Sequence, residues 1–226
     1  GGMRQRIMIA MAMSAKPDIL IADEATTALD VTTQAQLLEM IRNIAKETNT
    51  AVILVTHNLG IVARFAERIY VMYSGSVVET AGTRDIFKNS EHPYTRSLLR
   101  AIPRLDDPKD RILIPIEGLP PNPALRPDYC PFYDRCEYRK AECCQKNKPE
   151  LVKVGEEHYS ACWLTKEELQ QKEIEIQNAP KKAAPEKHIS REKVLEVHNV
   201  RKYFPVLKGI MKRKVGEVKA IEEITF

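Results

Sequence analysis

Residues 19–30 read ILIADEATTALD, an apolar run that ends in two adjacent acids, Asp23 and Glu24, with a third acid, Asp30, a short way beyond. A near-continuous apolar segment of this kind is typical of a strand buried on both faces of a parallel sheet. Carboxylates at the tip of such a strand cost free energy unless a cation meets them there. The stretch therefore predicts a strand and a cation-binding site at its carboxyl end.

The segments around this strand alternate between helical and strand patterns. Residues 1–17 and 31–49 predict helices, residues 50–57 a second buried strand, residues 59–70 a helix, and residues 71–82 a hairpin that turns at Ser74-Gly75. Such alternation predicts an α/β fold with a parallel sheet, whose chemistry lies at the carboxyl ends of the strands. Asp23, Glu24 and His57 all fall at such ends.

Composition excludes several classes of protein. The chain has 226 residues, of which 43% are hydrophobic, so it can bury a sizeable core. The net charge of +4 is mild and the basic residues are interleaved with acids, which argues against a nucleic-acid partner. Neither a membrane span nor a signal peptide is predicted. Because the sequence opens on Gly1-Gly2 without an initiator methionine, we expect a piece of a longer protein.

The pattern changes along the chain, which predicts four parts. Residues 1–100 carry the helix and strand alternation, and residues 101–165 are rich in proline and hold all five cysteines. Residues 166–192 are charged and nearly free of large apolar residues, which predicts an exposed helix followed by a flexible linker. Residues 193–226 predict the opening strands of another domain.

The side chains at the strand ends are the first candidates for chemistry. Asp23 can hold Mg²⁺, usually through water, and Glu24 can polarise a water aimed at a phosphate. His57 can hydrogen-bond a γ-phosphate and the attacking water, which would hold both in line. Taken alone, the acids could equally be solvated loop residues, and the histidine a capping or core residue.

Two glycines open the chain immediately before a helix-forming segment. Bare backbone amides at a helix N-terminus form an anion site, and glycine lets a phosphate approach closely. Gly1 and Gly2 are therefore candidates for phosphate contact, and an ordinary turn is the alternative.

These stretches, in this order and spacing, resemble the second half of an ABC-transporter ATPase. GGMRQR resembles the signature motif without its leading residues, ILIADE the Walker B strand, TALD the D-loop, and the histidine of VILVTHNL the switch histidine. Two positions depart from the family pattern: Met3 stands where many members have Gln, and Ala25 stands where Pro is usual. The fold implied is that of a P-loop NTPase.

The resemblance implies a role for each candidate. Asp23 would be the Mg²⁺ acid, Glu24 the general base and His57 the γ-phosphate sensor. Asp30 would contact the opposite module of a dimer, where Gly1 and Gly2 would touch the γ-phosphate bound on that module.

HPYTRSLLRAIP, residues 92–103, narrows the family. With the proline-rich residues 116–127 and the cysteines that follow, it resembles the C-terminal extension of oligopeptide/dipeptide-type importer ATPases. From the residues alone, His-Pro-Tyr-Thr predicts only a turn that opens a helix, so here the family supplies the functional meaning.

The five cysteines, Cys130, Cys136, Cys143, Cys144 and Cys162, predict a metal site, because four thiolates could bind zinc or an iron–sulfur cluster. The spacing lacks the tight C-x2-C pairs of zinc ribbons. The resemblance to the peptide-importer extension implies a [4Fe–4S] cluster on Cys130, Cys136, Cys143 and Cys162, with Cys144 the extra cysteine. Zinc and a set of disulfides stay open as alternatives.

Residues 193–226 resemble the first strands of a second ABC ATPase module, in which an aromatic side chain stacks on adenine. The resemblance implies Phe204 for this position, with Tyr203 its neighbour; an aromatic residue in an edge-strand core is the alternative. The phosphate loop G-x-x-x-x-G-K-[ST] appears nowhere in the sequence. We therefore expect a fragment across the junction of two fused modules, which does not hydrolyse ATP by itself.

The resemblance implies an ATP-hydrolysing subunit of an importer of peptides or related small solutes, with ATP and Mg²⁺ as cofactors. Its implied partners are a second ATPase module, transmembrane permease subunits and, indirectly, an extracytoplasmic solute-binding protein, at the cytoplasmic face of the plasma membrane. A non-transport ABC ATPase of translation or DNA repair is the main alternative, and HPYTRSLL with the cysteines speaks against it. A non-catalytic metal-binding interaction module is the second.

Overall fold

The computed structural model describes residues 2–27, 29–103, 107, 115–122, 124, 127–178, 195–209 and 213–225. Residues 1–180 and 181–226 form two compact units, each of which is described by itself. Most of the predicted linker, from residue 179 to residue 192, lies outside the described residues.

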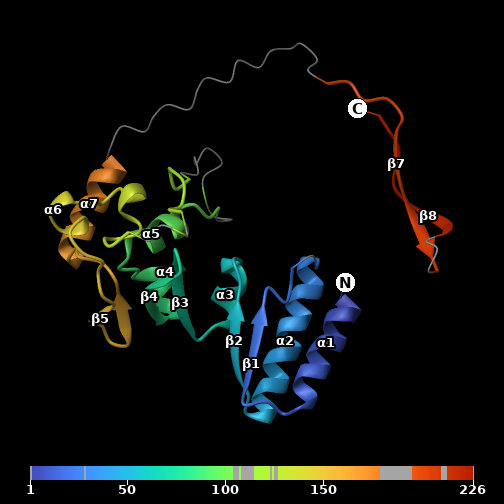
Figure 1. The fold of residues 1–226 in the computed structure, drawn as a ribbon, viewed down its shortest axis with the longest axis horizontal. Helices are drawn as coiled ribbons and strands as arrows, with labels where there is room; N and C mark the ends of the chain where they lie inside the picture. Colours follow the sequence, from blue (N-terminus) through green and yellow to red (C-terminus); the bar gives the residue numbers. More distant parts are fainter. Residues whose placement is uncertain are drawn as a thin grey trace. The chain divides into compact units, whose positions relative to one another are not determined.

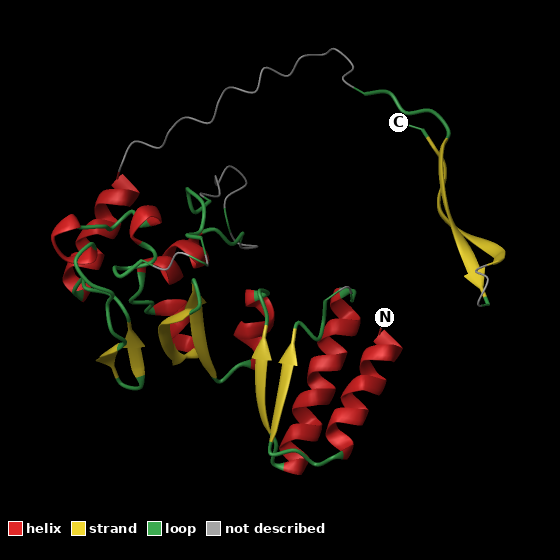
Figure 2. Ribbon diagram, viewed as in Figure 1, coloured by secondary structure: helices red, strands yellow, loops and turns green. Residues whose placement is uncertain are grey.

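The first elements of the larger unit form a parallel α/β layer. They are α1 (Gly2–Ser14), β1 (Ile19–Asp23), α2 (Val31–Thr48), β2 (Ala51–Val55) and α3 (Leu59–Phe65). β1 and β2 run side by side in the same direction and end together, with Asp23 opposite Val55 (Figures 1 and 2). The predicted parallel pairing of these two strands is confirmed.

Helix α2 has clear signals at both ends. Asp30 is its N-cap, and the Asp30 Oδ1 atom accepts a hydrogen bond from the Thr33 backbone N–H at 2.9 Å. Asn49 ends the helix in the left-handed conformation, with φ of 54°. Between the caps, Leu37 and Ile41 lie one turn apart and are buried in a core shared with α1 and β1.

The prediction that both strands are buried on both faces is wrong. Leu20 and Ala22 of β1 are buried, but Ile19 and Ile21 on its other face are 56% and 66% exposed. Ile53, the register partner of Ile21, is 50% exposed. The reason is that α1 and α2 cover one face of the β1–β2 pair, and no described element covers the other.

The elements that follow include the four strands of an antiparallel sheet. They are β3 (Arg68–Tyr73), β4 (Ser76–Gly82), α4 (Thr83–Lys88), α5 (Pro93–Arg100), the short 3-10 helix η1 (Tyr133–Arg135), α6 (Ala141–Cys144), β5 (Val152–Gly155), β6 (His158–Ser160) and α7 (Lys166–Asn178). The strands pair in the order β3-β4-β6-β5, so strands from either side of residue 100 share one sheet. The hairpin predicted at Ser74-Gly75 is confirmed, and both residues have positive φ, as a type I′ turn requires.

Two boundaries differ from the sequence prediction. The helix predicted over residues 59–70 ends at Phe65, and Arg68 already begins β3, because Ile69 alternates into the sheet core. Helix α7, predicted to be exposed, buries Leu169 to 1% exposure in the core that also contains Tyr138. Leu169 and Ile176, which packs against the same core, dock a helix whose other residues are mostly polar.

A buried polar cluster joins β4, β6 and the start of α5. The Glu79 carboxylate of β4 is fully buried, and it accepts hydrogen bonds from the backbone N–H groups of Glu91 at 2.6 Å and His92 at 3.2 Å. His158 of β6 lies 2.8 Å from Glu79 through its Nε2 atom. His92 is the N-cap of α5, and its Nδ1 atom accepts a hydrogen bond from the Tyr94 N–H. The Glu79 carboxylate thus fixes the backbone at the start of the His-Pro-Tyr-Thr stretch.

Burial makes His92 a source of acid sensitivity. Desolvation lowers its pKa from 6.5 to about 4, although the negative charge of Glu79 opposes the shift. Below pH 6.5 the unfolded chain takes up a proton on His92 that the folded chain does not. The free energy of unfolding should therefore fall by about 3 kcal/mol between pH 6.5 and pH 4, with no contribution from His92 above that range.

The prediction can be checked in full-length protein by hydrogen exchange of α5 between pH 4.5 and pH 7.5. His92→Asn keeps an N-cap acceptor but cannot titrate, so its stability should depend less on pH than that of the native chain. An equal pH dependence in both proteins would contradict the assignment to His92.

The smaller unit is a hairpin of β7 (Val200–Lys208) and β8 (Arg213–Ile224). Its strands pair antiparallel, with Phe204 opposite Val218. These are the strands predicted at the end of the chain.

Candidate functional site

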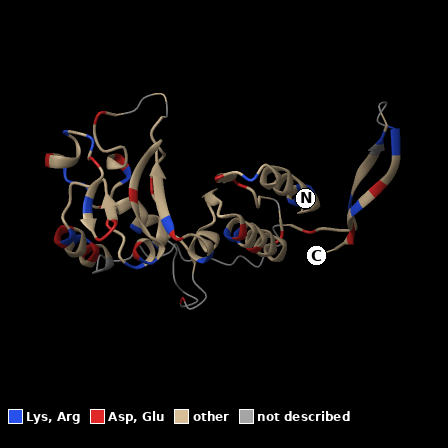
Figure 3. Cartoon of the chain, turned by 90° about the horizontal axis from the view of Figure 1, so that it is seen from below, with Lys and Arg blue, Asp and Glu red and all other residues tan. Residues whose placement is uncertain are grey.

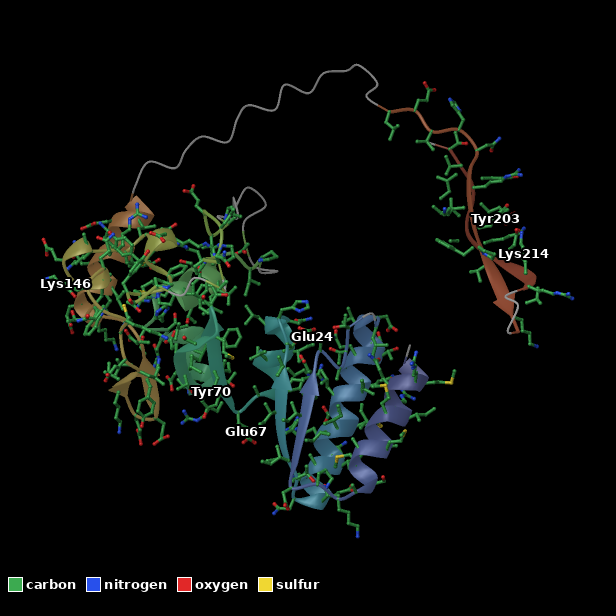
Figure 4. All side chains as sticks on the ribbon, in the orientation of Figure 1. Glu24, Glu67, Tyr70, Lys146, Tyr203 and Lys214 are labelled. Atoms are coloured by element: carbon green, nitrogen blue, oxygen red, sulfur yellow. The ribbon has the colours of Figure 1, made fainter. Side chains whose placement is uncertain are left out.

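Glu24 and His57 meet at the carboxyl ends of β1 and β2. The Glu24 backbone N–H donates to the Val55 carbonyl at 2.9 Å, which extends the strand pairing by one residue. The His57 ring Nδ1 atom lies 2.7 Å from Glu24 Oε1, and the His57 backbone N–H donates to the same oxygen at 3.2 Å. Figure 4 shows Glu24 at this end of the β1–β2 pair. The structure thus brings together two predicted catalytic residues that are far apart in sequence.

Thr27 engages the other oxygen of the same carboxylate. Its hydroxyl donates to Glu24 Oε2 at 2.8 Å. The hydrogen bond from Thr27, followed by the one from His57, lowers the pKa of Glu24, so the carboxylate is the stable form. The Glu24 side chain is 37% exposed and that of His57 is 83% exposed, so solvent reaches the pair directly.

The Glu24 backbone has an unusual conformation. Its φ of 47° lies in the left-handed region, which costs a non-glycine residue about 1–3 kcal/mol when the surrounding structure imposes it. This turn directs the chain from the end of β1 toward Thr27, whose N–H donates to the Glu24 carbonyl at 3.0 Å.

Asp23, Asp30 and Gly2 have different local settings. Asp23 is the last residue of β1. Asp30 caps α2, and its hydrogen bonds from Thr33 lower its pKa. A Cβ atom on Gly2 would lie 3.0 Å from the Thr33 side chain, a tight contact that a larger residue could occupy only if Thr33 shifted. Gly1 lies outside the described residues.

Two residues of this site were not among the predicted ones. Thr27 binds Glu24, and Gln5 of α1 donates from Nε2 to the Thr27 carbonyl at 3.4 Å, a long hydrogen bond. The sequence offered one usable signal for Thr27, a hydroxyl three positions after the acid, where a turn can return it to the carboxylate.

Four of the five cysteines, Cys130, Cys136, Cys143 and Cys162, gather in one apolar cluster with Phe132 and Tyr138. All five are free thiols, so the disulfide alternative is not what the structure contains. The Cys143 and Cys144 sulfur atoms are 3.5 Å apart. Burial raises the pKa of Cys136 and raises that of Cys162 to about 12, so without a metal these groups are neutral thiols.

The cysteine cluster has the donor chemistry of a metal site but not its geometry. Thiolates suit zinc and iron–sulfur clusters. In the part of the chain that the structure describes, however, no three His, Cys, Asp or Glu side chains are grouped closely enough to hold a metal ion. The same finding covers Asp23 and its neighbours.

The two aromatic residues of β7 differ in availability. Phe204 is 53% exposed, and the Lys202 ammonium lies 5.4 Å from its ring centroid. The Tyr203 hydroxyl donates to Glu222 at 3.2 Å, and the Lys219 ammonium lies 5.6 Å from the centroid of its ring. A lysine thus lies over each ring, and Phe204 is the more exposed of the two residues.

Comparison with known proteins gives consistent matches. Residues 78–143 match the family described as "Oligopeptide/dipeptide transporter, C-terminal region". The chain is 40% identical over 226 residues to the oligopeptide transport ATP-binding protein OppD of Mycobacterium bovis, of which it covers 37%. It is 49% identical over 164 residues to the dipeptide transport ATP-binding protein DppD of Bacillus subtilis, covering 73% of this chain and 48% of that one. The chain thus spans half or less of these relatives.

Among solved structures, the ATP-binding cassette MJ0796, described as a dimer in a post-hydrolysis state bound to ADP and Pi, is 32% identical. The match covers 37% of this chain and 35% of that one, with a TM-score of 0.34.

Proposed function

Because the chain is a relative of the ATP-binding proteins of oligopeptide and dipeptide importers, we propose that it forms part of the ATP-hydrolysing subunit of a peptide or related small-solute importer. The observation that carries the proposal is the Glu24–His57 pair at the ends of two parallel strands, where hydrolysis of a nucleotide needs a base and a phosphate-binding group. The fold of the larger unit is then part of an ABC-type P-loop NTPase.

The residues of the site would divide the work as follows. Glu24, held as a carboxylate, accepts the proton of the attacking water, and His57 donates a hydrogen bond to the γ-phosphate. Asp23 would hold Mg²⁺, which neutralises phosphate charge when bound. Carboxylate oxygen is the ligand type that Mg²⁺ prefers, so the residue present fits the ion.

The remaining predicted contacts belong to the interface between two modules. Gly1 and Gly2 would approach the γ-phosphate on the opposite module, and Asp30 would contact that module from the start of α2. Phe204 would stack on adenine, for which its exposed ring is suited.

Two fused modules are also proposed. In this assignment, residues 1–100 are the end of one ATPase domain, 101–165 its extension, 166–192 a charged helix and linker, and 193–226 the opening of the second domain. The alignment with the Mycobacterium bovis protein supports it, since it runs over all 226 residues of the chain.

The partners proposed are a second ATPase module, permease subunits at the cytoplasmic face of the membrane, and a solute-binding protein indirectly. No helix among the described residues is long and apolar enough to cross a membrane. Basic and acidic side chains are intermingled in Figure 3, which supports the absence of nucleic acid from the partners.

The decisive test is full-length protein assembled with its permease subunits in vesicles. Peptide uptake that requires ATP hydrolysis would support the proposal. Hydrolysis by a protein that never associates with a permease would favour the non-transport ATPases of translation or DNA repair. An intact protein that binds a metal but hydrolyses no ATP would favour a non-catalytic interaction module.

The cysteine cluster is proposed to bind a [4Fe–4S] cluster through Cys130, Cys136, Cys143 and Cys162, with zinc as the alternative. Their convergence on one apolar core supports this proposal, although the thiols would have to close in on the metal. A bound metal would also favour thiolates in a place where burial otherwise raises their pKa values.

Cys136→Ser should abolish metal binding in full-length protein purified anaerobically, because one of four ligands is lost, whereas Cys144→Ser should retain it. Iron, sulfide and zinc analysis with an absorbance spectrum checks this. A colourless protein that contains zinc would overturn the iron–sulfur assignment, and a metal-free native protein would overturn both.

A further inference from the structure

We propose that Thr27 is a positioning residue for the general base, and that its hydroxyl fixes the Glu24 carboxylate in the orientation used for hydrolysis. The inference deepens the proposed function and depends on it for the identity of the reaction. The contact itself is a 2.8 Å hydrogen bond from Thr27 Oγ1 to Glu24 Oε2.

The two oxygens of the carboxylate are held by two separate segments of the chain. His57, on the loop after β2, holds Oε1 through its ring and its backbone N–H. Thr27, on the turn after β1, holds Oε2. A carboxylate bound at one oxygen can still rotate about its terminal torsion, which has a broad energy profile. Binding at both oxygens removes that rotation.

Thr27 is itself fixed by contacts that do not involve the carboxylate. Its N–H donates to the Glu24 carbonyl at 3.0 Å, and its own carbonyl accepts a hydrogen bond from Gln5 of α1. The preceding residue, Thr26, is buried, and its hydroxyl accepts a hydrogen bond from Gln34 of α2 at 2.7 Å. The hydroxyl is therefore preorganised by two helices and by the turn, as the support of a catalytic group needs to be.

The chemistry favours positioning over catalysis for Thr27. A threonine hydroxyl has no useful basicity near neutral pH, and this one already donates a hydrogen bond to Glu24. Proton transfer from water depends strongly on the angle and distance at the accepting oxygen, so an unrestrained base loses rate without losing affinity for the nucleotide.

The experiment uses the full-length protein with Thr27→Val, which removes the hydroxyl at nearly constant shape, and Thr27→Ser, which restores it. We expect Thr27→Val to lower kcat about 5- to 10-fold, the worth of one such hydrogen bond, with little change in KM for ATP. Thr27→Ser should recover the native kcat. In a Glu24→Gln background, Thr27→Val should cause no further loss, because its effect passes through Glu24.

A matched control and a spectroscopic measurement complete the test. Thr32→Val makes the same change at an exposed threonine of α2 and should leave kcat unaltered. The ¹³C NMR signal of the Glu24 carboxyl carbon should move in Thr27→Val and return in Thr27→Ser.

The outcomes separate the two proposals. A native kcat in Thr27→Val, a failure of Thr27→Ser to restore the rate, or an unmoved carboxyl signal would overturn the role of Thr27. If the signal moves while the native protein hydrolyses no ATP, the proposed function fails and the Thr27–Glu24 contact stands.

Discussion

Glu24→Gln in the full-length protein should lower the rate of ATP hydrolysis by two to four orders of magnitude, the usual contribution of a general base. The amide has nearly the shape of the carboxylate, but it cannot take a proton from water. Because it can still hydrogen-bond Thr27 and His57, the turn after β1 should keep its conformation. Nucleotide binding should therefore persist while the rate of ATP hydrolysis falls by that factor.

Steady-state hydrolysis and equilibrium binding of a fluorescent ATP analogue measure the two properties separately. Glu39→Gln, at a position of α2 where the side chain is 45% exposed, is the matched control and should hydrolyse ATP at the native rate. Unaltered hydrolysis in Glu24→Gln would remove the general-base assignment, and loss of nucleotide binding would indicate a structural role instead.

The part of this site that could be predicted is the part that strand geometry dictates. Parallel strands end at the same edge of a sheet, so placing Asp23, Glu24 and His57 at strand ends was enough to predict that two of them would meet. Thr27 escaped prediction because its contact depends on the positive φ of Glu24, which the residue type does not indicate.

Long-range pairing was the least predictable feature of the fold. β6 has three residues, too few for an alternation pattern. It pairs with β4, which is distant in sequence, and Glu79 is the register partner of Ser160. The exposed face of β1 could not be predicted for a different reason. An apolar sequence shows that a strand can be buried on both faces, but it does not show whether neighbouring elements cover both.

The same long-range pairing makes Glu79 the residue whose loss should destabilise the larger unit most. Glu79→Ala would leave His158 and two backbone N–H groups buried without their acceptor. Breaking a buried pair by removing one partner typically costs about 3–5 kcal/mol. Since Glu79 connects β4 to β6 and to the start of α5, the loss should appear in all three elements together.

Hydrogen exchange resolved by segment is the suitable measurement, because a protein with several domains does not unfold in one transition. Glu79→Gln keeps an acceptor oxygen for one of the two backbone N–H groups, so it should be destabilised less than Glu79→Ala. Glu39→Ala, at a partly exposed position of α2, should change stability by no more than about 0.5 kcal/mol. Faster exchange in β6 alone would mean that His158 carries the effect. Faster exchange in β4, β6 and α5 at once is expected if the Glu79 carboxylate holds these three elements together.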